Sequence, residues 1–205
     1  MVPLMKRPLS LLLSASLALA ACRAEAPPTP APSAAPTAGV AAETVEPTTA
    51  APVTVAEPAL AIEGEGLRLF DPATGSARPL PFGMAWERVQ EALAYRGKPA
   101  TGRNEECGAG PLDYAQWEDS LTLYGQGGQF VGWFIDSRAE GRISTAAGVG
   151  PGTTRQDLEA AYAAEVFEST LGTEFAAGNL SGVLDSPHPD SPVSALWAGT
   201  SCNFR

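Results

Sequence analysis

All fifteen aromatic residues of this 205-residue chain lie after position 69. Phenylalanine, tyrosine and tryptophan bury large areas and dominate the packing of protein cores. The part of the chain before position 69 therefore lacks the large apolar groups that a packed core needs. We expect one globular domain over residues 59–205, which is long enough to bury about 68–70% of its unfolded surface.

The charge and the histidine content exclude several classes of function. The chain has 13 Lys and Arg against 23 Asp and Glu, a net charge of −10, whereas a general nucleic-acid binder presents a basic face to phosphates. A single histidine argues against histidine-based catalysis and against a zinc site with several histidines. We therefore expect no catalytic residue, no metal, no cofactor and no nucleic-acid partner.

The first 21 residues have the layout of an export signal. Lys6 and Arg7 give a positive start, and residues 9–21 form an apolar stretch broken only by serines. This stretch is shorter than the roughly 20 apolar residues that cross a bilayer. Small residues followed by Cys22 resemble the lipobox of bacterial lipoproteins. The alternative is an ordinary secreted protein with a chance cysteine near its cleavage site.

The lipobox resemblance implies a modification and a location. In bacterial lipoproteins, the cysteine that corresponds to Cys22 carries a diacylglycerol, the chain is cut before it, and the new amine is often acylated. Two or three acyl chains anchor a protein stably. Because Arg23 follows, where an aspartate usually retains a lipoprotein in the inner membrane, the resemblance favours an outer-membrane lipoprotein that faces the periplasm or the cell exterior.

Residues 22–58, from the lipidated cysteine onwards, form a predicted tether. Positions 23–58 contain eight prolines, eleven alanines and six threonines, with no aromatic residue, leucine or isoleucine. Such a segment cannot bury enough apolar surface to offset the entropy of ordering it, so we expect it to stay disordered or partly in polyproline II. It would lift the domain away from the membrane, although a segment merely tolerated by selection would have the same composition.

The domain is predicted to be α+β, with short strands and two helices. Apolar spacing and turn residues predict helices at residues 83–93 and 152–162, the second with Thr153 and Gln156 at capping-box spacing. Further strands are predicted at residues 67–70, 77–80, 120–124, 130–135, 142–145, 180–184 and 193–197.

The order of these elements recurs at an offset of 69 residues. Aligning Gly83 with Gly152 places Val89 on Leu158. We therefore expect two tandem halves, 59–140 and 141–205, each a helix followed by an antiparallel meander, that share one sheet with the helices packed on one face. This pattern resembles the β-lactamase-inhibitor-like and SmpA/OmlA-like (BamE-type) superfamily of exported bacterial proteins. The resemblance covers residues 66–202 and implies a protein-binding or scaffold role without chemistry.

Cys107 and Cys202 are the cysteines that remain once Cys22 is lipidated. Outside the cytoplasm, two such thiols most often form a disulfide. A bond across ~95 residues would stabilise the fold by roughly 4–5 kcal/mol in the chain-entropy model. The alternative, a redox-active or nucleophilic cysteine, lacks the Cys-x-x-Cys spacing and a second histidine.

Tyr114 and Trp117 are the predicted partner-binding residues. They lie in a polar stretch, and rigid aromatic side chains dominate protein interfaces when exposed. The alternative is that they cap the sheet edge and cover the disulfide.

Three other patterns favour structural explanations. The glycine-rich residues 148–152 predict a tight turn, because Pro151 removes an N–H and no lysine follows. Ser186, His188 and Asp190 alternate in a proline-rich loop and are expected to splay apart. The carboxylate pairs at 105–106 and 118–119 lack the spacing of a calcium loop.

The sequence thus predicts a non-enzymatic envelope lipoprotein that binds a protein or another envelope component through an open sheet face. A binder of small molecules or cell-wall fragments is the first alternative. A hydrolase that uses carboxylates is the second.

Overall fold

A computed structural model describes residues 56–202 of the chain. The predicted signal peptide (1–21), Cys22 and the predicted tether as far as residue 55 lie outside the described residues, as do residues 203–205. None of the helices between residues 56 and 202 is long and apolar enough to span a membrane.

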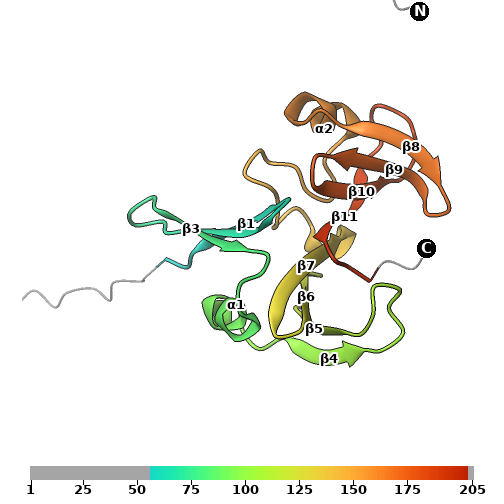
Figure 1. Cartoon of the computed structure of the whole chain (residues 1–205). Helices are drawn as coiled ribbons and strands as arrows, with labels where there is room; N and C mark the ends of the chain where they lie inside the picture. The colour runs from blue at the N-terminus through green and yellow to red at the C-terminus, as the bar shows by residue number, and fades with distance from the viewer. Residues whose placement is uncertain (1–55, 203–205) are drawn as a thin grey trace, which may run out of the picture. The chain divides into compact units, whose positions relative to one another are not determined.

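Most of the regular structure is antiparallel β (Figure 1). A three-stranded sheet has the order β1-β2-β3, and an eight-stranded sheet has the order β4-β5-β6-β7-β11-β10-β9-β8. The small sheet comprises β1 (Ala59–Glu63), β2 (Gly66–Phe70) and β3 (Ala77–Pro81). The larger sheet comprises β4 (Ala100–Asn104), β5 (Leu112–Gln116), β6 (Thr122–Gln126), β7 (Gln129–Asp136), β8 (Glu165–Ser169), β9 (Gly172–Ala177), β10 (Leu180–Leu184) and β11 (Val193–Gly199).

The helices are short. The helix α1 (Trp86–Ala92) precedes β4–β7, and α2 (Arg155–Ala161) precedes β8–β11. Two 3₁₀ turns, η1 (Ala94–Arg96) and η2 (Ser137–Ala139), complete the helical residues between 56 and 202. The meanders β4–β7 and β8–β11 meet where β7 pairs with β11.

The predicted α+β class, with helices packed on one face of the sheet, is wrong. Each α-helix has only seven residues and buries one side chain, Val89 or Leu158. The three-stranded sheet instead supplies four buried side chains to the main core: Ile62, Leu67, Leu69 and Leu80. The core is therefore built chiefly between two sheets, and the protein is mostly β.

One face of the eight-stranded sheet, which we call the inner face, contributes to this core. Trp133 and Ile135 of β7, Phe175 of β9 and Leu196 of β11 are completely buried there. The indole Nε1 of Trp133 donates a 2.9 Å hydrogen bond to the carbonyl of Glu63 in β1. This contact joins the two sheets at the centre of the core.

The proline-rich loop near His188 caps α2. The backbone N–H groups of Arg155 and Gln156 donate to the carbonyls of Ser191 and Pro189, at 2.8 and 2.9 Å. The N-cap is Thr154, whose hydroxyl accepts from the N–H of Asp157, so the predicted capping pair of Thr153 and Gln156 is wrong by one residue.

Candidate functional site

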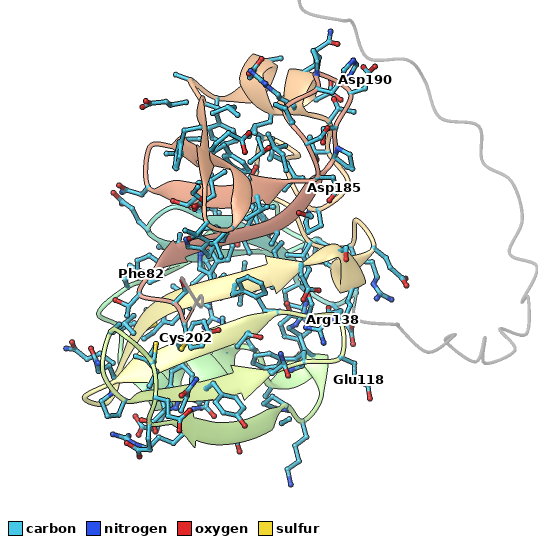
Figure 2. All side chains as sticks on the ribbon, turned by 90° about the vertical axis from the view of Figure 1, so that its right-hand side faces the viewer. Phe82, Glu118, Arg138, Asp185, Asp190 and Cys202 are labelled. Atoms are coloured by element: carbon cyan, nitrogen blue, oxygen red, sulfur yellow. The ribbon has the colours of Figure 1, made fainter. Side chains whose placement is uncertain are left out.

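The face of the eight-stranded sheet opposite the inner face, which we call the outer face, is the first candidate. Strand register places Phe134 of β7 opposite Trp197 of β11, and Val183 of β10 opposite Ala195. Because side chains alternate along a strand, these residues point away from Trp133 and Leu196. Figure 2 looks towards this side of the sheet, where Cys202 lies in front of the strands of the first meander.

An apolar pocket of about 430 Å³ lies on the outer face. Its walls come from strands β6, β7, β10 and β11, from the turn after β8, and from the segment after β11. The lining residues are Tyr124, Phe134, Leu171, Val183, Ala195, Trp197 and Cys202. A concave apolar site with a few polar atoms is the usual form of a binding pocket in a protein.

One exposed acidic residue accompanies the apolar ones on the outer face. The register places the exposed Glu165 of β8 in line with Trp197, whereas Glu174 of β9, in line with Val183 and Ala195, is only 2% exposed. Phe167, in line with Glu174, is 42% exposed at the edge strand β8. A partner for this face would combine apolar side chains with positive charge.

Cys107 and Cys202 meet at one end of the outer face. Both are free thiols in the structure, and both belong to a small apolar cluster around Tyr124. The amide of Asn104 donates a 3.2 Å hydrogen bond to the Sγ atom of Cys202. The thiols predicted to form a disulfide are therefore neighbours, and the bond itself stays a prediction.

Cys202 does not have the properties of an activated nucleophile. Burial, with a hydrogen bond and charge interaction from Cys107, raises the pKa of the Cys202 thiol to about 11. A reactive cysteine has a lowered pKa, because the thiolate is the nucleophile. Burial likewise raises the pKa of Tyr124 to about 12. Both groups are neutral at physiological pH.

The two aromatic residues predicted to bind a partner lie in different places. Tyr114, on β5, is half-buried beside the cysteine cluster. Trp117 follows β5, is 6% exposed, and belongs to the main core. The structure therefore does not bring the two side chains together on one surface.

Other candidates do not form a catalytic arrangement. The side chains of His188 and Asp190 are 70% and 81% exposed, with Nδ1 and Oδ2 3.7 Å apart. Because carbonyls of the same loop cap the first N–H groups of α2, that helix start offers no anion site. Between residues 56 and 202, no three His, Cys, Asp or Glu residues group together as metal ligands would.

The sequence predicts binding through an open sheet face, but it does not predict which residues line the pocket on that face. Phe134 and Trp197 lie in strands that are apolar on both sides, so periodicity alone cannot separate a core-facing residue from a pocket-lining one.

The chain matches no protein-family model, no curated protein and no solved structure.

Proposed function

We propose that this chain is a non-enzymatic lipoprotein of the cell envelope, anchored through acyl chains on Cys22, that binds another protein through the outer face of its eight-stranded sheet. The observation that carries the binding role is the apolar pocket of about 430 Å³ on that face. The sequence before residue 59 supports the anchor and the tether.

The anchor predicts a specific amino-terminal mass. Native protein purified from a membrane fraction is expected to begin at Cys22 and to carry two or three acyl chains on that residue. Mass spectrometry of the amino-terminal peptide measures this directly. An unmodified Cys22 within a longer or soluble chain would contradict the anchored location.

The chemistry of the outer face defines the partner. Aromatic rings from Tyr124, Phe134 and Trp197 surround a hollow large enough for one or two apolar side chains. The exposed carboxylate of Glu165 lies on the same face, on the side of the second meander. The partner is therefore a protein segment in which an apolar side chain is flanked by lysine or arginine.

Val183→Asp is expected to weaken partner binding at least tenfold. The half-buried Val183 side chain lines the pocket, and a carboxylate there would lose its hydration when an apolar side chain enters. Partner recovery by affinity purification of the full-length protein, followed by titration of the partner, measures the effect.

The matched control is Ala160→Asp, which adds the same charge to the exposed surface of α2. It is expected to leave partner binding unchanged, and circular dichroism checks that both variants fold. If the two variants bound the partner with equal affinity, the pocket would not be the partner-binding site.

A further inference from the structure

A second hollow lies at the other end of the strands, away from the cysteines. It has a volume of about 700 Å³ and lies where Trp117 follows β5. Its lining residues are Glu57, Tyr95, Arg96, Gly97, Lys98, Trp117, Glu118, Asp119 and Arg142. Figure 2 shows Glu118 and Cys202 on opposite sides of the view, so this cavity and the apolar pocket are separate.

Three side chains in the cavity wall have unused hydrogen-bonding capacity. Arg96 of η1 and Asp119 form an ion pair through one guanidinium nitrogen and one carboxylate oxygen. The remaining oxygen Oδ1 of Asp119, the Nε of Arg96 and the hydroxyl of Tyr95 are buried and make no hydrogen bond of normal geometry, and the Tyr95 hydroxyl lies close enough to the Arg96 side chain to interact with it. A buried polar atom without a partner costs about 1–3 kcal/mol. The wall therefore favours a ligand that would pair with these atoms.

Trp117 lies beside this group of side chains. Its indole Nε1 donates a 3.1 Å hydrogen bond to the carbonyl of Gly97, and the Arg96 guanidinium lies 6.0 Å from the centre of its ring. An arginine at this distance is attracted to the face of the ring. Because Trp117 also lines an adjoining hollow of about 310 Å³, one rigid residue supports both spaces.

The unused atoms define the chemistry of the ligand. Asp119 Oδ1 can only accept, Arg96 Nε can only donate, and the Tyr95 hydroxyl can do both. Adjacent hydroxyl groups satisfy all three, because each hydroxyl both donates and accepts. A charged ligand is disfavoured, since Arg96 and Asp119 already neutralise each other and the lining holds three cationic and three anionic residues.

We propose that this cavity binds a neutral saccharide through adjacent hydroxyl groups, with Tyr95, Arg96 and Asp119 as the recognition residues. Because the three atoms are buried, the sugar reaches them when the long side chain of Arg96 turns aside and leaves its contact with Tyr95. This site is independent of the partner-binding role of the outer face. The sugar is either free or part of a polymer.

The test is calorimetric titration of the full-length protein with the neutral disaccharides N,N′-diacetylchitobiose, cellobiose and maltose, and with glucosamine and glucuronic acid as charged probes whose neutral counterpart is glucose. At least one neutral disaccharide is expected to bind with a Kd of about 1 mM or below. Sedimentation with insoluble chitin or cellulose distinguishes a polymer-binding site from one for free sugars.

Tyr95→Phe is the decisive variant. It removes an unpaired buried hydroxyl, so the melting temperature is expected to stay the same or rise, while the affinity for the sugar falls about five- to tenfold. The matched control is Tyr162→Phe, because Tyr162 lies outside this cavity. Val183→Asp is expected to leave sugar binding unchanged.

Three results would contradict a saccharide site in this cavity. The first is that no neutral disaccharide binds at about 10 mM. The second is that Tyr95→Phe binds the sugar with unchanged affinity, and the third is that a charged probe binds more tightly than its neutral counterpart. None of these bears on the partner-binding face, whose variants are different.

Discussion

Trp133→Ala is expected to lower the free energy of unfolding by about 3–5 kcal/mol, the range for removing a buried tryptophan side chain. Trp133 is completely buried on β7, at the centre of the eight-stranded sheet. Its loss leaves a cavity and also leaves the Glu63 carbonyl without the indole donor. Because domains of this size have a free energy of unfolding of only about 5–15 kcal/mol, the variant is expected to lose a large part of its total stability.

Urea unfolding of the full-length protein, followed by circular dichroism, measures the loss. Trp133→Phe helps to separate the two contributions, because it keeps a six-membered aromatic ring in the core and removes the N–H donor with the rest of the indole. We expect this variant to lose about 1–2 kcal/mol. A loss below about 1 kcal/mol in Trp133→Ala would contradict a core that is shared by the two sheets.

Formation of a bond between Cys107 and Cys202 is expected to add roughly 4–5 kcal/mol to the free energy of unfolding. The thiols are already neighbours in one cluster, with Cys107 8% exposed, so closing the bond requires little movement of the chain. The bond would tie the segment after β11 to the loop between β4 and β5. It would therefore fix one wall of the apolar pocket, which Cys202 lines.

Protein isolated from the envelope without reductant should contain this bond. Its mass should rise only after reduction and alkylation, and its urea midpoint should fall in the presence of reductant. The double variant Cys107→Ser, Cys202→Ser should have the urea midpoint of the reduced protein, both with and without reductant. Two alkylatable thiols in the native material, together with an unchanged midpoint on reduction, would count against the bond.

The sequence predicted the strands whose apolar residues recur clearly. The segments at 67–70, 77–80, 120–124, 130–135, 180–184 and 193–197 correspond to β2, β3, β6, β7, β10 and β11. The edge strands β4 and β8 were missed because almost every residue in them is exposed, so they carry little alternation of polar and apolar side chains. Without β1, the first hairpin could not be recognised as a separate sheet.

Residues 142–145 show the opposite error. Ile143 and Thr145 are buried on either side of the half-buried Ser144, so the segment alternates like a strand. In the structure it forms only an isolated bridge to Ala61 of β1. The alternating burial of residues 142–145 therefore reflects their packing beside β1, since they do not form a strand of either sheet.

The candidate sites depended on neighbours that are distant in the sequence. Trp117 is buried although its sequence neighbours are polar, because Gly97 accepts its N–H and Arg96 lies over its ring. Arg96 and Asp119 are 23 positions apart and meet only once η1 and the β5–β6 loop are placed together. The two cysteines, in contrast, could be paired by elimination, and the structure places them side by side.

The recognition role that we propose for the outer face is tested most directly by photo-cross-linking from position 134 in cells that make the protein. A photoreactive phenylalanine analogue at Phe134 faces the pocket, whereas the same analogue at the exposed Arg78 of β3 lies on the other sheet. We expect a discrete adduct with one protein from position 134, abolished by Val183→Asp, and none from position 78. Identical adducts from both positions, or no adduct from position 134 in the intact envelope, would contradict a partner-binding outer face.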